Sequence, residues 1–108
     1  MIYADFLKNS VGNLKGIRLA DHAGFSEMGT DIVCAAVSSS FFLVANTITD
    51  VMHLEPLALR AEPGELIINM KDEDCRACEV LFKGLYIHLK DLHEQYPQNL
   101  NVNITEVQ

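Results

Sequence analysis

Basic residues are scarce in this chain of 108 residues. It has 8 Lys plus Arg against 15 Asp plus Glu, which gives a formal net charge of -7. Proteins that bind nucleic acids normally carry a basic face, and docking on an anionic membrane also requires positive charge. The composition therefore disfavours both classes and suits a basic partner. Positions 19–59 contain no Lys or Arg that would repel such a partner.

Cysteine is also sparse, and its number is odd: Cys34, Cys75 and Cys78. The opening MIYADFLKNS lacks the basic segment and apolar core of a secretory signal, so we expect a cytoplasmic protein with reduced thiols. A structural zinc site needs four ligands, and no second C-x-x-C or paired-His motif accompanies Cys75 and Cys78. We therefore expect these two thiols to pack within a helix, and we expect no metal or other cofactor.

A long, purely apolar run is missing too. The uncharged stretch from Ile32 to Thr49 approaches transmembrane length, but six polar residues interrupt it: Ser38, Ser39, Ser40, Asn46, Thr47 and Thr49. A spanning helix needs about 20 mostly apolar residues. We therefore interpret this stretch as a helix in the core of the domain, covered on most of its faces.

Short apolar or alternating segments between turn-forming residues predict five strands, at 2–8, 14–20, 57–62, 65–71 and 99–105. In the third of these, Leu57, Leu59 and Ala61 share one face. Helical patterns cover 31–53 and 73–95. With no repeat or linker, the order β-β-α-β-β-α-β predicts a single α+β domain over 1–108, with one mixed or antiparallel sheet packed against two helices.

A loop-like segment at 21–30 precedes the first helix, and Cys34 follows three residues after Asp31. With Thr30 or Asp31 as the N-cap, Cys34 would lie in the first helical turn, where the helix dipole favours a thiolate and free N–H groups can hold an oxyanion. If the loop folds back, His22 can reach the sulfur as a base. On position alone, Cys34 as a small core residue and His22 as an ordinary loop residue remain open.

The stretch DHAGFSEMGTDIVCAAVSS resembles the ribosomal-processing cysteine protease family, called Prp. Its hallmark is His-Ala-Gly, a short loop, and then Asp-x-Val-Cys-x-Ala-Val-Ser opening a helix. The motif occupies residues 22–38, and the length and element order match over nearly the whole chain. The resemblance implies His22 as general base and Cys34 as nucleophile, with Asp31, Ser38 and Gly24 supporting the site or the substrate.

The resemblance also implies a homodimeric peptidase that removes the N-terminal extension of large-subunit ribosomal protein number twenty-seven, cutting after an aromatic residue and supporting ribosome assembly. One residue departs from the pattern: Asp21 stands where the family commonly has Gly. Its carboxylate could restrict closure of the loop at the Gly24 and Gly29 hinges, or could orient His22. The alternatives are a non-catalytic, ribosome-associated binding module for a basic protein and a structural dimer without a site.

Overall fold

The computed structural model describes residues 1–21 and 28–107 and shows the predicted element order. The strands are β1 (Ile2–Lys8), β2 (Leu14–Asp21), β3 (Ala58–Glu62), β4 (Glu65–Asn69) and β5 (Leu100–Glu106). The helices are α1 (Met28–Asn46), continued by a π-helical turn (Thr47–Val51), and α2 (Cys75–Gln95), preceded by a 3-10 turn (Asp72–Asp74). The prediction of an α+β fold is confirmed.

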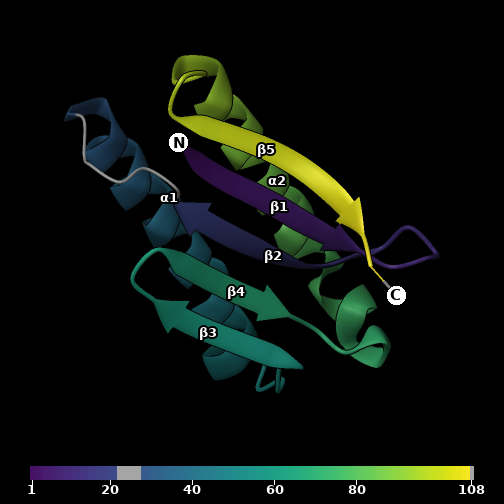
Figure 1. Cartoon of the computed structure of the whole chain (residues 1–108). Helices are drawn as coiled ribbons and strands as arrows, with labels where there is room; N and C mark the ends of the chain where they lie inside the picture. Colours follow the sequence, from purple (N-terminus) through teal and green to yellow (C-terminus); the bar gives the residue numbers. More distant parts are fainter. Residues whose placement is uncertain (22–27, 108) are drawn as a thin grey trace.

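The five strands form one mixed sheet in the order β3-β4-β2-β1-β5. β1 pairs with β5 in parallel, and the other neighbours are antiparallel. Both helices cover the same face of this sheet (Figure 1). On that face, alternate residues of the central strands, such as Phe6, Ile17 and Ile68, are fully buried, and they meet Phe41 of α1 and Phe82 of α2 in one core.

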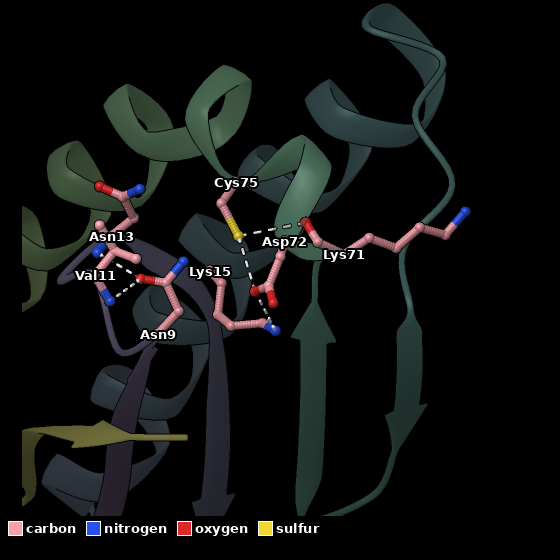
Figure 2. Close-up of polar contacts among 7 residues, drawn as sticks. All are labelled: Asn9, Val11, Asn13, Lys15, Lys71, Asp72 and Cys75. Atoms are coloured by element: carbon pink, nitrogen blue, oxygen red, sulfur yellow. Dashed lines mark hydrogen bonds and ion pairs between the residues drawn. The ribbon is translucent and has the colours of Figure 1, made fainter. Parts of the chain in front are cut away.

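The turn between β1 and β2 is fixed by the side chain of Asn9. Its Oδ1 accepts hydrogen bonds from the backbone N–H groups of Val11 (3.1 Å) and Asn13 (3.0 Å), as Figure 2 shows. Gly12 follows with a φ of 96°, a conformation that favours glycine. The turn and a register shift between Leu7 and Lys8 together place Ile2 opposite Asp21 at the far end of the hairpin.

Helix α1 is less covered than the sequence predicted. Only about a third of the helical span Ile32–Val51 is buried, because one side packs on the sheet while Ile32, Leu43 and Val51 are exposed. By length and composition alone, this is the one helix among the described residues that could cross a membrane, with a mean hydropathy of 1.8. Core helices of soluble proteins meet the same criterion, and the inner side of α1 supplies core residues here.

Helix α2 confirms the predicted packing of its apolar stripe, since Cys78, Leu85 and Leu89 are buried. Its start is tied to β2 by a buried lysine. The Lys15 side chain is 6% exposed, and its Nζ lies 3.1 Å from Oδ1 of the largely exposed Asp72 (Figure 2). The Cys75 thiol lies beside Asp72 and donates to the Lys71 carbonyl at 3.3 Å. The ion pair between Lys15 and Asp72 fixes where α2 begins relative to the sheet.

Candidate active site

A cavity of about 270 Å³ lies between α1 and the end of the sheet where β2 finishes and β4 begins. Its walls come from the start of β1, the end of β2, the inner side of α1 and the β3–β4 turn. The lining residues are Ile2, Leu19, Ala20, Asp21, Cys34, Val37, Ser38, Phe42, Glu62, Pro63, Gly64, Glu65 and Leu66. Most of the lining side chains are apolar, so the thiol of Cys34 meets a predominantly apolar space.

Cys34 and Ser38 reach the cavity from one side of α1 because residues four apart lie one turn above the other. Both are half-buried, and Cys34 packs at the border of the core without being enclosed by it. An enclosed core cysteine would offer no route for a substrate. The position therefore favours the reactive interpretation of Cys34 over the small-core-residue interpretation, and it brings Ser38 to the same site.

The predicted start of the helix is wrong. α1 begins at Met28, so Thr30 and Asp31 belong to its first turn and neither is the cap. Cys34 is then about two turns from the helix start, beyond the four N–H groups that lack an intrahelical acceptor. The dipole and the free N–H groups of the helix end therefore do not act at the sulfur in the way the sequence suggested.

The predicted base, His22, and the supporting Gly24 lie outside the described residues. Asp21, which immediately precedes His22, ends β2 and lines the cavity, so the chain enters the 22–27 segment directly at the site. The N–H of Asp21 donates to the carbonyl of Gly64 at 3.1 Å, which joins this entry point to the β3–β4 turn. The residue that departs from the family pattern is therefore a cavity residue.

The β3–β4 turn is held by charges on the sheet face opposite the helices. Glu65 Oε2 accepts from Arg18 Nη2 at 2.7 Å and Nε at 3.1 Å, and Glu65 Oε1 accepts from Arg60 at 3.2 Å. The two hydrogen bonds from Arg18, with the one from Arg60, keep the pKa of the Glu65 carboxyl below its ordinary value. Pro63 and Gly64, the latter with a φ of 85°, complete the turn. One wall of the cavity is thereby clamped to β2.

Cys75 and Cys78 lie apart from this cavity and are buried, with 1% and 0% of their surfaces exposed. Burial raises the pKa of both thiols, and nearby Asp74 acts in the same direction. Among the described residues, no group of three His, Cys, Asp or Glu side chains is arranged to hold a metal ion. The packing role predicted for Cys75 and Cys78 agrees with their burial in the structure.

Sequence reasoning missed most of the cavity wall. Ile2, Leu19 and Leu66 lie far apart in the chain and meet only because the register places Ile2 beside Asp21 and Leu19 beside Leu66. Strand order cannot be read from alternation alone, so no local pattern marks these residues. Pro63 and Gly64 are residues typical of a turn, but nothing in the sequence indicates that this turn lines the same cavity as Cys34.

Comparison with known proteins agrees with this geometry. The sequence profile of the family described as Cysteine protease Prp matches residues 1–101. The ribosomal processing cysteine protease Prp of Bacillus subtilis (strain 168) is 27% identical over 107 residues, covering 94% of this chain and 96% of its own length. Its counterpart in Staphylococcus aureus (strain Mu50 / ATCC 700699) is 26% identical over 104 residues, covering 95% and 98%.

Solved structures give the same result. The Prp protease of S. aureus in complex with a substrate peptide matches with a TM-score of 0.85 at 24% identity, covering 97% of this chain and 100% of that one, which shows a shared fold. The same protease with a covalently linked product peptide gives a TM-score of 0.80 at 25% identity, with the same coverage. The chain, with its thiol-bearing cavity, therefore belongs to the Prp family of cysteine proteases.

Proposed function

We propose that this cysteine protease removes the N-terminal extension of large-subunit ribosomal protein number twenty-seven and so supports ribosome assembly. The observation that carries the proposal is the half-buried thiol of Cys34 in an apolar cavity. Relatives in B. subtilis and S. aureus bear the name ribosomal processing cysteine protease, and the S. aureus protease has been solved with a substrate peptide. These names support the substrate assignment.

The chemistry requires no cofactor. His22 takes the proton of the Cys34 thiol, and the thiolate attacks the carbonyl carbon of the scissile bond. The tetrahedral intermediate collapses to a thioester as the proton passes to the departing amine. Water then hydrolyses the thioester and regenerates the thiol. Because α1 begins well before Cys34, the proposal assigns activation of the sulfur to His22 and not to the helix end.

The cavity walls support cleavage beside a large apolar side chain. Ile2, Leu19, Phe42 and Leu66 supply an apolar lining, which suits an aromatic ring on the substrate. The net charge of -7 favours approach of a basic ribosomal protein. The same charge supports the proposal that the protein binds neither nucleic acid nor membranes. The proposal that it acts in the cytoplasm with reduced thiols is supported by its few cysteines, which are odd in number.

We also propose that the protein is a homodimer joined through the outer sides of the two helices. A second hollow of about 300 Å³ lies between α1 and α2, lined mainly by apolar side chains that include Leu43 and Val80. These two side chains are 70% and 81% exposed. Contiguous apolar surface of this kind is typical of an interface. A Leu43→Asp variant is expected to run as a monomer in size-exclusion chromatography with light scattering, where the unaltered chain runs as a dimer.

The substrate assignment is tested with a synthetic peptide that spans the junction between the extension and the mature ribosomal protein. Incubation with the purified chain followed by mass spectrometry is expected to give one cut, directly after an aromatic residue. A peptide in which alanine replaces that aromatic residue is the control, and it should be cut at least about tenfold more slowly because the cavity loses its apolar occupant. Binding of the peptide without any cut would instead establish the non-catalytic binding module.

A further inference from the structure

Strand β3 is a free edge of the sheet beside the cavity. All five of its residues, Ala58–Glu62, are exposed, and within the described part of the chain β3 pairs only with β4. The N–H and C=O groups on its outer side therefore face no other strand of the described chain. Such an edge is a template for pairing with another extended chain. Arg60, whose charge would discourage pairing, is engaged by Glu65 on the sheet face opposite the helices.

An apolar row runs along this edge on the face that carries the helices. Ala61 lies opposite Leu66, which lines the cavity, and Leu59 lies opposite the buried Ile68. Leu59 and, just before the strand, Leu57 are 51% and 61% exposed. The sequence assigned these residues to one face of a strand, as a packed strand would require, but Leu57 and Leu59 stay more than half exposed. The row instead continues the apolar cavity wall outward.

We propose that the β3 edge binds the extended part of the peptide substrate next to the scissile bond, which adds to the sheet as a sixth strand. The substrate class is an extended peptide with apolar side chains at every second position, which would rest on Leu57 and Leu59. This inference rests on the proposed function for the identity of the peptide. It adds the β3 edge as the place where the peptide segment on one side of the scissile bond is bound.

The geometry favours this occupant because the edge and the cavity are continuous. β3 ends at Glu62, and Glu62 and the turn that follows it line the cavity, so a peptide that pairs with β3 and continues past Glu62 meets the wall of the Cys34 cavity. Strand addition gives affinity through main-chain hydrogen bonds and selects side chains through alternate positions. The spacing of two between Leu57 and Leu59 matches that alternation.

The test measures binding to the full chain carrying Cys34→Ala, so that the peptide stays intact. Two fluorescent junction peptides are compared. Each is methylated on every second backbone nitrogen of the segment that carries the alternating apolar side chains, next to the scissile bond. The two peptides differ in which of the two alternating sets of nitrogens is methylated. Strand addition uses one alternating set of N–H groups. Methylation of that set is expected to weaken binding at least about tenfold, and methylation of the other set by less than about threefold. Equal effects of methylating the two sets would overturn the proposal.

A matched pair of variants locates the site. Leu59→Ser, in the same Cys34→Ala background, is expected to weaken binding of the unmethylated peptide about tenfold. Val11→Ser is the control, because Val11 is an apolar residue, 82% exposed, in the turn between β1 and β2, two strands that β4 separates from β3. Equal affinities for the two variants would overturn the proposal. A loss of dimer at unchanged peptide affinity in Leu59→Ser would assign β3 to a second copy of the chain instead.

The outcome for the proposed function can be read separately. If binding depends on which set of peptide nitrogens is methylated but the unaltered protein does not cut the peptide, the proposed function is overturned while the proposed binding of the peptide at β3 stands. Cleavage of the junction peptide without dependence on the methylated set or on Leu59 overturns the proposed binding at β3 alone.

Discussion

The three thiols are expected to react with iodoacetamide at very different rates in the native protein. Cys34 lines an open cavity, whereas Cys75 and Cys78 are almost completely buried. Burial also raises the pKa of these two thiols above the ordinary value of 9.0. A thiol with that ordinary value is about 3% thiolate at pH 7.5, and a raised pKa lowers this fraction further.

The larger factor is access to the sulfur. Cys78 belongs to the core cluster beneath α2, so it meets reagent only when the helix detaches from the sheet. Such an opening requires a good share of the 5–15 kcal/mol that stabilises a typical domain. Even about 4 kcal/mol slows labelling by about a thousandfold, since each 1.4 kcal/mol is a factor of ten. We therefore expect Cys34 to react at least about a thousand times faster than Cys78.

The assay is timed alkylation at pH 7.5, followed by proteolysis and mass spectrometry of the peptides that carry each cysteine. Labelling in denaturant is the control, because unfolding should bring the three rates within about threefold of one another. Native labelling of Cys75 or Cys78 as fast as that of Cys34 would refute the reasoning, since it would mean that the start of α2 is not closed. Uniformly slow labelling would contradict an accessible nucleophile.

Three further predictions concern the frame that holds the site. Replacement Gly16→Ala would place a Cβ 2.2 Å from the Ile68 carbonyl oxygen in the middle of the sheet, and we expect urea titration to show a loss of about 3 kcal/mol or more. Asp72→Asn weakens the pairing of the buried Lys15 ammonium and is expected to lower the free energy of unfolding by about 1–3 kcal/mol, whereas Lys15→Met should leave it nearly unchanged. Equal losses of stability in the two variants would contradict the ion-pair account. Because the pKa of Glu65 is lowered in the folded protein, its contribution to stability is present above the ordinary value of 4.5 and is lost as the pH falls through the folded value. The urea midpoints of Glu65→Gln and the unaltered chain should therefore converge at acidic pH. A constant difference between the two midpoints from pH 7 to pH 3 would contradict this.

Much of the fold was predictable because periodicity is a local property. The alternation in 14–20 and 99–105 and the stripe of α2 identify elements whose bounds differ from the structure by one or two residues at most. The start of α1 was wrong by three residues, since Asp31 resembles a cap while helical backbone extends back through Gly29 to Met28. That small error has a chemical consequence, because it removes the helix end from Cys34.

Burial was less predictable than element type. Alternation in 57–62 correctly indicated a strand, but only the strand order shows that it is an edge, with Leu59 left exposed. Lys15 shows the reverse, since a lysine in a strand is expected at the surface and here is buried with Asp72 as its partner. At the site, the motif identified Cys34 and Ser38, whereas the cavity walls depend on long-range register.

The central claim is that the Cys34 thiol performs the cleavage, and it is tested most directly by comparing Cys34→Ser with the unaltered chain on the junction peptide. Ser39→Ala, an exposed position on the same helix that does not line the cavity, is the matched control. We expect Ser39→Ala to retain its cleavage rate within about threefold. Cys34→Ser should lose at least about a thousandfold while its urea midpoint is unchanged, because the hydroxyl keeps the shape but not the nucleophile. A Cys34→Ser protein that cleaves the peptide at the unaltered rate would contradict the account.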